Sequence, residues 1–189
     1  IYAALYQIIA NCNFYLDYID RVVAATTDDP KLKDLDTYTG EVYAIRALAY
    51  SELLKCYCKA YHPETAKQEL GVVLRTTTLD KQPLPRASLY DSYQQVIRDL
   101  ERAEELLDEK NDAYSSAFVT RAMACALHAR VALYMEDWQS AIDYSTELIE
   151  SRNFALSSAV SYYTNDMTYF DYMWNYDVAT EVIWRIGFT

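Results

Sequence analysis

The amino-acid sequence predicts an all-α protein made of paired helices, with at most a short strand or two near residues 71–76 and 181–186. Only 3 of its 189 residues are Gly and 4 are Pro, which favours long helices with short connections. Apolar residues make up 52% of the chain and charged residues 24%, enough apolar side chains for a substantial core. In five segments the apolar residues recur at the spacing of one helix face.

The first helix is predicted from the apolar residues between Leu5 and Val23, which recur every three or four positions. Pro30 disfavours a helical conformation at the residue before it. We therefore expect the first helix to stop at the TTDDP sequence of residues 26–30.

The second helix is expected to run from Thr39, whose hydroxyl can cap the free N–H groups, to about Tyr61. The short β-branched stretch 71–79 then indicates an extended connector or a single edge strand. The third helix is expected to begin at Ser88, with Asp91 three residues later in the arrangement of a capping box.

The fourth and fifth helices are expected to form a hairpin. The fourth begins near Thr120, and the fifth comes after a very short turn at Glu136-Asp137. Because the turn is so short, the two helices must pack against each other. After Asn153 the pattern changes, and residues 162–176 hold seven aromatic rings.

The chain is strongly acidic, with a net charge of −11 and a pI near 4.6. Nucleic acids and anionic lipid surfaces attract basic patches, so neither is an expected partner. No stretch reaches the ~20 apolar residues that a membrane-spanning helix needs. The chain begins at Ile1 without Met or a leader pattern, so we expect a processed or partial chain.

The four cysteines form no metal-binding pattern. Cys56 and Cys58 lie two positions apart in a helical segment, so their side chains point in different directions. Cys12 and Cys125 fall on apolar faces and are expected to be small core residues. The spacing neither assigns nor excludes disulfides. No metal and no cofactor is expected.

Three polar side chains fall within apolar helix patterns. Arg46 and Arg130 are expected to pair with carboxylates or to cap carbonyl groups, because an unpaired buried charge is costly. His128 is expected to be a packed, hydrogen-bonded imidazole.

No catalytic residue is predicted. The sequence has no Gly-rich phosphate loop, no nucleophile elbow and no HExxH motif. A glycosidase with two inward-facing carboxylates stays an open alternative until the fold is known, since 28 acidic residues make chance pairs common.

Residues 126–149 resemble one tetratricopeptide unit. Ala129 and Ala141 take the small-residue positions where its two helices cross, and Asp137-Trp138 takes the turn. One unit cannot bury its own apolar face, so at least two more helix pairs are expected. The predicted fold class is therefore a stack of tetratricopeptide-like hairpins.

Five blocks of sequence, in order along the chain, carry a more specific likeness. They are LYQIIANCNFYLDYID, GEVYAIRALAYSELLKCYC, the run PLPRASLYDSYQQVIRDLERAEELLD, RAMACALHARVALYMEDW and WNYDVATEVIWRI. The third block is the strongest, with matches at Pro85, Arg86, Ser88, Tyr93, Ile97, Asp99, Leu100, Ala103 and Leu107. In this order the blocks resemble the SusD/RagB family of bacterial outer-membrane nutrient-binding lipoproteins. Val73 departs from the Pro of the family pattern, so that loop is expected to run differently.

The resemblance implies that residues 1–189 are the N-terminal helical-repeat part of a longer protein, without its C-terminal half and its lipidated N-terminus. It implies non-catalytic binding of an oligosaccharide or related nutrient at the bacterial cell surface. It also implies delivery to a SusC-like TonB-dependent outer-membrane transporter. The membrane would be reached only through the lipid anchor, which this chain does not contain.

The aromatic run supplies the predicted glycan-binding residues, Tyr169, Tyr172, Trp174 and Asn175. Tyr169 and Tyr172 are the better candidates for exposed rings, because the family pattern favours a core position for Trp174. The alternative function is a tetratricopeptide adaptor that binds a peptide in its groove. The isolated stack is also expected to expose an apolar face and to self-associate.

Overall fold

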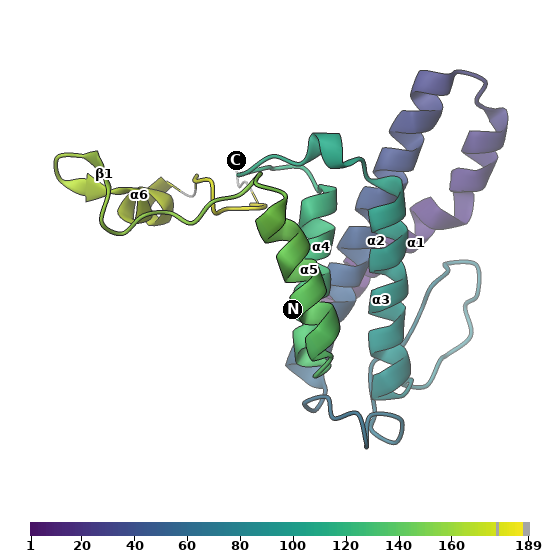
Figure 1. Ribbon diagram of the computed structural model, residues 1–189. Helices are drawn as coiled ribbons and strands as arrows, with labels where there is room; N and C mark the ends of the chain where they lie inside the picture. Colours follow the sequence, from purple (N-terminus) through teal and green to yellow (C-terminus); the bar gives the residue numbers. More distant parts are fainter. Residues whose placement is uncertain (177, 187–189) are drawn as a thin grey trace.

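The computed structural model describes residues 1–176 and 178–186 and shows an array of long helices from which a smaller segment extends (Figure 1). The helices are α1 (Tyr2–Ala25), α2 (Asp29–Tyr57), α3 (Leu89–Leu106), the 3-10 turn η1 (Glu109–Asn111), α4 (Arg121–Tyr134), α5 (Trp138–Glu150) and α6 (Tyr169–Tyr176). Two short strands, β1 (Tyr162–Thr164) and β2 (Met167–Thr168), pair antiparallel. The all-α prediction is confirmed.

The long helices pack in chain order, each against the next, from α1 through α5. The α1–α2 pair and the α4–α5 pair are hairpins with three-residue links, residues 26–28 and 135–137. These two hairpins confirm the paired helices predicted from the sequence, but α3 has no hairpin partner among the described residues, so the third pair expected from the tetratricopeptide likeness is not found there. Between them, α3 packs against both α2 and α4.

Three helices start where the sequence predicts, and each start has a side-chain cap, of which the sequence predicted the one at Ser88. The Ser88 hydroxyl accepts a hydrogen bond from the Asp91 amide at 3.0 Å. The Thr120 hydroxyl accepts one from the Met123 amide at 3.3 Å, and Asp137 caps α5. Each cap satisfies an amide that has no partner inside its own helix.

The predicted bounds of the second helix were wrong at both ends. The helix begins at Asp29, ten residues before Thr39, with Pro30 in its first turn. Proline is tolerated there because the N–H it lacks would have no partner inside the helix. The helix ends at Tyr57, where Arg86 Nη2 donates to the Tyr57 carbonyl at 3.3 Å. The predicted end near Tyr61 overlooked this donor from a distant segment.

The connector between α2 and α3 is extended, but it forms no strand. The Tyr6 hydroxyl pairs with both the amide and the carbonyl of Val73, at 3.1 Å each. The Tyr50 hydroxyl does the same for Arg75, at 3.0 and 2.7 Å. The two phenols thus take the place of a neighbouring strand along this edge, and only one isolated bridge, Leu70 to Ser88, forms nearby among the described residues.

Near residues 71–76 and 181–186, where at most a short strand was predicted, the described residues form only isolated bridges. Residues 181–186 make a single bridge, between Trp184 and Ser116, rather than a strand. The strand pair forms inside the aromatic run instead, where a two-residue turn, Asn165-Asp166, reverses the chain. Asn and Asp favour such tight hairpin turns.

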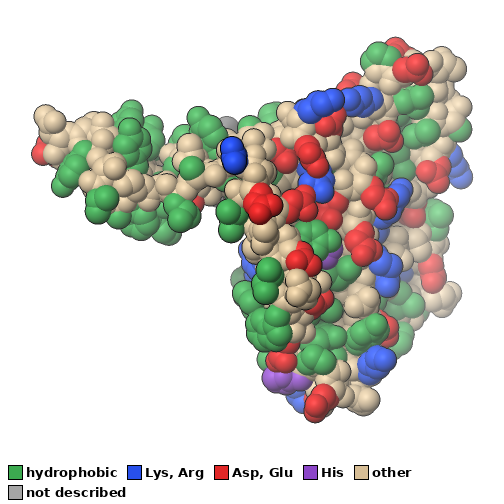
Figure 2. Space-filling model, viewed as in Figure 1, with side chains coloured by type: hydrophobic (Ala, Val, Ile, Leu, Met, Phe, Trp, Pro, Cys, Tyr) green, Lys and Arg blue, Asp and Glu red, His purple; other side chains and the backbone are tan. Residues whose placement is uncertain are grey.

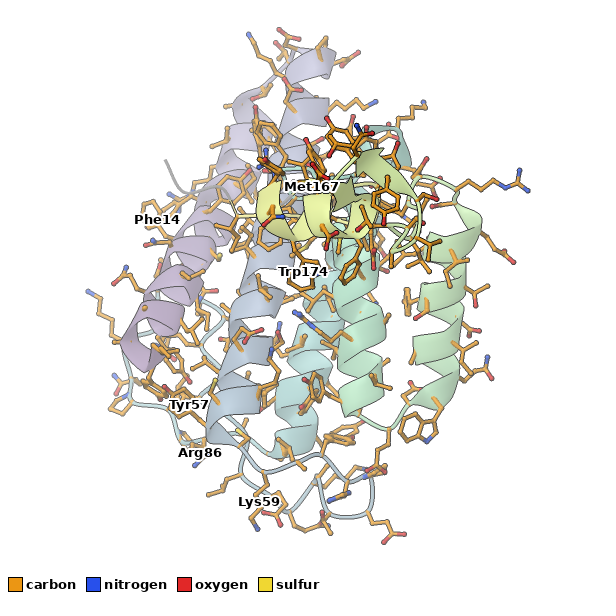
Figure 3. The ribbon with its side chains drawn as sticks, turned by 90° about the vertical axis from the view of Figure 1, so that its left-hand side faces the viewer. Phe14, Tyr57, Lys59, Arg86, Met167 and Trp174 are labelled. Atoms are coloured by element: carbon orange, nitrogen blue, oxygen red, sulfur yellow. The ribbon has the colours of Figure 1, made fainter. Side chains whose placement is uncertain are left out.

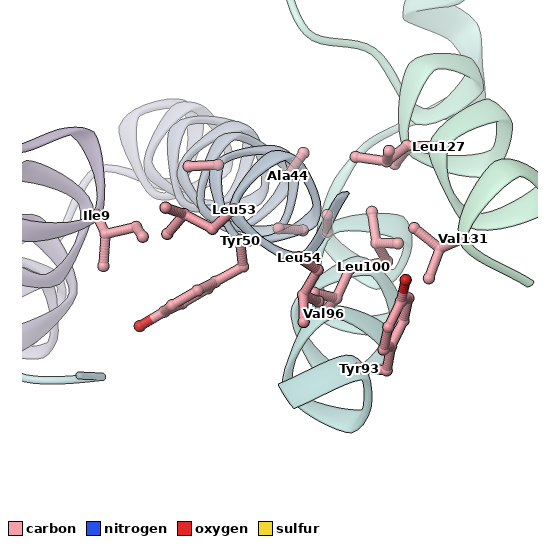
Figure 4. Packing of buried hydrophobic residues seen from close by; sticks show 14 of the residues in the cluster. Ile9, Ala44, Tyr50, Leu53, Leu54, Tyr93, Val96, Leu100, Leu127 and Val131 are labelled. Atoms are coloured by element: carbon pink, nitrogen blue, oxygen red, sulfur yellow. The ribbon is translucent and has the colours of Figure 1, made fainter. Parts of the chain in front are cut away.

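The hydrophobic core lies between α1, α2, α3 and α4 (Figure 4). Tyr50 and Leu53 of α2, Leu100 of α3 and Val131 of α4 are almost completely buried in it. Small residues let the helices approach, and a Cβ added at Gly40 would lie 2.8 Å from Leu107 Cγ. No residue of α5 contributes to this core.

A buried ion pair crosses the core. Arg46 Nε and Nη2 donate to the two carboxylate oxygens of Asp99 at 2.8 and 2.6 Å. Arg46 Nη1 donates to Asn13, which in turn donates to the Arg75 carbonyl at 2.6 Å. Burial lowers the pKa of Arg46, but the hydrogen bond and charge of Asp99 outweigh it and raise that pKa. The carboxylate partner predicted for Arg46 is confirmed. The hydrogen-bond network around Arg46 joins α1, α2, α3 and the connector.

His128, Cys12 and Cys125 are buried, as the sequence predicts, whereas Arg130 is exposed. His128 is buried, with its Nδ1 2.9 Å from Glu104, and it stacks on Tyr144, as expected. Arg130 is exposed, with a guanidinium nitrogen 3.8 Å from a Glu52 oxygen. Cys12 and Cys125 are buried, and all four cysteines are free thiols.

One face of the array is apolar and uncovered, which we call the open face. It carries Trp138, Ile142 and Ile149 of α5, all more than half exposed. Beside it, a groove of about 600 Å³ runs between α1, α2, α4 and residues 181–186. Figure 2 shows hydrophobic side chains along the α5 side of the body and over the extended segment. Among the described helices, none has the length and apolar character to span a membrane.

Candidate functional site

Residues 151–176 leave the end of α5 and protrude from the helical body as an arm (Figure 1). Arg152 has a left-handed φ of 59°, which turns the chain away from the helix axis. At the base of the arm, the Ala155 amide donates to the Thr180 carbonyl at 3.1 Å, and the Thr180 hydroxyl donates back to the Ala155 carbonyl at 2.9 Å. The outgoing and returning chain are therefore tied together where they meet the body.

The arm also has its own local order. Thr168 caps α6, because its hydroxyl accepts from the Asp171 amide at 3.1 Å, while the Asp171 carboxylate accepts from the Thr168 amide at 3.1 Å. The Thr168 hydroxyl also donates to the Asp171 carboxylate at 2.7 Å, and this bond, with the one from the Thr168 amide, lowers the pKa of Asp171. The next two amides of α6, those of Tyr169 and Phe170, donate to the carbonyls of Ser161 and Ser158. These two hydrogen bonds fix the start of α6 against the loop that contains Ser158 and Ser161.

A groove of about 420 Å³ lies between the arm and the body, and we call it the tyrosine groove. One wall is made by Tyr163 of β1 with Tyr169 and Tyr172 of α6, and Tyr114 enters from the loop before α4. The rest of the lining is short hydroxyl and aliphatic side chains: Leu156, Ser157, Ser158, Ser161, Val178, Ala179 and Thr180. Among the described residues that line it, none carries a charge.

The tyrosines of the arm form a continuous row. The ring centroids of Tyr163 and Tyr172 are 4.2 Å apart, and those of Tyr172 and Tyr176 are 4.8 Å apart. Tyr169 meets Tyr163 edge to face at 5.8 Å. The neighbouring Tyr163 raises the pKa of the Tyr172 phenol, and the phenol is neutral at physiological pH even at its ordinary pKa. The groove offers neutral rings and hydroxyl groups.

The loop before α4 holds Tyr114 at the mouth of the groove. The Ser115 hydroxyl accepts from the Ala179 amide and donates to the Ala179 carbonyl, both at 3.0 Å. Arg185 Nε donates to the Ser115 carbonyl at 3.2 Å. These bonds join the loop to residues 178–185, so the body and the arm each supply one side of the groove.

Two of the four predicted ligand residues line the tyrosine groove, and two do not. Tyr169, 47% exposed, and Tyr172, half-buried, face it. Trp174 lies elsewhere on α6, 73% exposed, and meets Phe170 edge to face at 6.1 Å. Asn175 is exposed and is not among the groove's lining residues. Figure 3 views the arm end-on, with Trp174 labelled on α6 and Met167 at the strand pair.

The expectation that Trp174 closes the last helix pair in the core is not met, because its side chain is the most exposed aromatic of the arm. The reason is that α6 packs on β1 and β2 and not on α5. Conversely, the sequence pattern overlooked two groove residues. Tyr163 is part of the aromatic run but carries no mark that sets it apart from its neighbours. Tyr114 has no sequence signal at all, since it lies 49 positions before Tyr163 and meets it only through the fold.

Within the described part of the chain, no group of three or more His, Cys, Asp or Glu side chains is arranged to hold a metal ion. The lining of the tyrosine groove consists of aromatic rings, hydroxyl groups and short aliphatic side chains.

The family model of SusD-like proteins, described as "Starch-binding associating with outer membrane", matches residues 1–133. A curated relative, the SusD-like protein P38 of Formosa agariphila, is 29% identical over 145 residues. That match covers 76% of this chain and 27% of the relative. The chain therefore spans about a quarter of the length of this relative.

Solved structures agree with the family match. A SusD superfamily protein from Bacteroides thetaiotaomicron is 25% identical with a TM-score of 0.70, over 82% of this chain and 33% of that one. A SusD superfamily protein from Bacteroides fragilis has a TM-score of 0.75 at 22% identity, over 98% of this chain and 39% of that one, and so supports the fold. Because the family model covers well over half of its residues, the chain belongs to the SusD-like family.

Proposed function

We propose that this chain is the N-terminal helical part of a longer, non-catalytic protein that binds an oligosaccharide or related nutrient at the bacterial cell surface. The observation that carries the proposal is the tyrosine groove in a chain of the SusD-like family. The negative face of an aromatic ring attracts the polarised C–H groups of a pyranose ring. Hydroxyl groups beside the rings can then bond to the sugar hydroxyls.

Tyr169 and Tyr172 are the ring residues of the proposed site, with Tyr163 and Tyr114 completing the groove. Trp174 and Asn175 stay predicted ligand residues, and they would act on another side of α6. An extended ligand that passes over α6 would meet both sets. The buried core and the ion pair of Arg46 hold the body together, and α5, which leads into the arm, packs on α4 of that body.

The proposal further includes the partner and the location. In this proposal the bound nutrient passes to a SusC-like TonB-dependent transporter, and a lipid anchor outside this chain holds the protein at the outer membrane. The family description places its members in association with the outer membrane, which supports this part. Co-purification of the full-length protein with a large outer-membrane transporter tests it, and recovery without such a transporter would count against it.

Isothermal titration of the chain with neutral oligosaccharides tests the binding. Tyr172→Ala and Tyr169→Ala should each weaken binding about tenfold, which corresponds to about 1.4 kcal/mol. Trp138→Ala is the matched control, because it removes an exposed aromatic ring of the body that lies outside the groove. Circular dichroism confirms that each variant is folded.

Three outcomes decide the proposal. Loss of binding in the groove variants alone supports it. Loss in Trp174→Ala with unchanged binding in Tyr172→Ala would move the site to the other side of α6. Binding of a peptide without any saccharide binding would favour the tetratricopeptide adaptor.

A further inference from the structure

The tyrosine groove has a charge pattern that restricts what it can bind, and this inference rests on the proposed function. Its lining residues, as far as the structure describes them, are all uncharged. Two of the described acidic side chains lie next to lining residues: Asp171 precedes Tyr172 on α6, and Glu181 accepts a hydrogen bond from the Ser157 amide at 2.9 Å. An anion in the groove would lie near these carboxylates and would meet no cation among the described lining residues.

The arginines near the arm do not supply the missing cation. Arg185 is directed to the Ser115 carbonyl at 3.2 Å and is not among the lining residues. Arg152 lies at the end of α5 and does not line the groove either. Proteins that select carboxylated or sulfated ligands place Arg or Lys against the anion.

Three of the four serine and threonine hydroxyls that line the groove, those of Ser157, Ser158 and Thr180, are already engaged. The Ser158 hydroxyl accepts from the Ser161 amide at 2.8 Å, and the Thr180 hydroxyl donates to the Ala155 carbonyl. These bonds fix the floor of the groove. The Ser161 hydroxyl makes no hydrogen bond to another described residue, and its side chain is exposed. It is therefore available to a ligand in the groove that Tyr172 also lines.

We infer that the tyrosine groove selects neutral saccharides and discriminates against sugars that carry carboxylate or sulfate groups. The rings of Tyr169 and Tyr172 take the apolar faces of the sugar, and phenol and Ser161 hydroxyls take its hydroxyl groups. A neutral saccharide brings no charged group into the groove, so it needs no oppositely charged side chain there. Charged groups on the sugar would lose water without gaining an opposite charge.

The test uses pairs of ligands that differ only in charge. The probes are α-linked and β-linked glucose hexasaccharides and the same hexasaccharides with their C6 hydroxymethyl groups oxidised to carboxylates. Titration calorimetry of the 189-residue chain measures each dissociation constant at low and at moderate salt. The neutral form of the preferred linkage should bind at least about tenfold more tightly than its oxidised form, with the larger ratio at low salt.

A charge-introducing variant tests the inference by a gain of binding, because a loss of binding could also come from misfolding. Ser161→Arg places a cation at an exposed position of the groove and should strengthen binding of the oxidised hexasaccharide at least about fivefold. Ser161→Gln is the matched control, since it adds a long polar side chain without the charge. Circular dichroism checks that both variants keep their helices.

The outcomes separate this inference from the proposed function. Tighter or equal binding of the oxidised sugar by the unmodified chain would overturn the neutral selectivity while leaving saccharide binding intact. No binding of either form, with every variant folded, would overturn saccharide binding in the groove and the selectivity with it. Neutral preference that Ser161→Arg reduces and Ser161→Gln leaves unchanged supports the inference.

Discussion

The helices α2 and α5 belong to the same array, yet they bury their side chains to very different extents. α2 has neighbours on both sides, α1 and α3, and it buries nine of its residues. α5 contacts α4 alone among the described helices, and it buries none. Both carry apolar residues at helical spacing. Position in the array, more than sequence pattern, decides how much of an apolar face is removed from water.

The polar contacts of the two regions differ in the same way. At α2, Arg46 is 4% exposed and is held by two bonds to Asp99. On the α4 side, Arg130 is exposed, and its nearest carboxylate oxygen, on Glu52, is 3.8 Å away. The buried Arg46 therefore depends on its carboxylate partner, whereas the exposed Arg130 does not. Four predictions test this difference, from the largest expected effect to the smallest.

Arg46→Met should lower the free energy of unfolding by about 3–5 kcal/mol, because it leaves the Asp99 carboxylate buried without its cation. Arg130→Met, at an exposed and loosely paired site, should change it by less than about 1 kcal/mol. Urea denaturation of both variants measures the two values. Equal losses of unfolding free energy in the two variants would show that the protein depends equally on the polar partners of Arg46 and Arg130.

Leu100→Ala should lower the free energy of unfolding by about 2–5 kcal/mol, since it opens a cavity among α2, α3 and α4. Ile149→Ala removes a similar apolar group from a side chain that is 74% exposed, and it should cost no more than about 0.5 kcal/mol. Urea denaturation again measures both values. A large loss for Ile149→Ala would mean that α5 packs more closely than the structure shows.

The open face should bind a fluorescent hydrophobic dye and should cause the chain to self-associate at high concentration. The double variant Ile142→Ser with Ile149→Ser should reduce both effects with little change in thermal stability. Dye fluorescence and size-exclusion chromatography measure them. A monomer that binds no dye would contradict the prediction.

The smallest effect is expected at Asp17, which holds the connector onto α1. Its carboxylate accepts from the Thr78 amide at 2.7 Å and from the Thr78 hydroxyl at 2.6 Å. Burial raises the pKa of Asp17, but these bonds together outweigh it, so the pKa is lowered. The contact should therefore be fully present above the unfolded value of about 3.9 and be lost as the pH falls through the lower folded value.

Amide hydrogen exchange at Thr78 checks this prediction. Exchange, corrected for its intrinsic pH dependence, should be slow at neutral pH and faster when the pH is lowered through the folded pKa of Asp17. Asp17→Ala should give fast exchange at every pH. The Met123 amide, which donates to the Thr120 cap of α4 away from Asp17, provides a reference that should not change.

Local patterns predicted the helices of this protein well, because helix periodicity and N-caps involve residues within one or two turns. Ser88, Thr120 and Asp137 cap the helices whose starts the sequence indicated. The start of α2 was missed because a proline can either end a helix or occupy its first turn. Asp28 at the N-cap and Asp29 in the first turn are residues typical of a helix start, so the TTDDP sequence ends α1 and begins α2 within a few residues.

The candidate site was predicted only in part. The aromatic run indicated Tyr169 and Tyr172, and the structure places both in the groove. Trp174 and Asn175 came from the same run, but the helical turn of α6 separates them from that groove. Tyr114 was not predictable, because only the bonds between Ser115 and Ala179 bring its loop to the arm.

The sequence by itself determined the helical class, most helix starts and the family likeness, because these depend on short-range spacing and on motif order. The tertiary structure decided three other features. It set the depth to which each apolar face is buried, the replacement of a strand by the hydroxyls of Tyr6 and Tyr50, and the meeting of Tyr114 with the arm. Each of these depends on contacts between residues far apart in the chain, which local propensity does not encode.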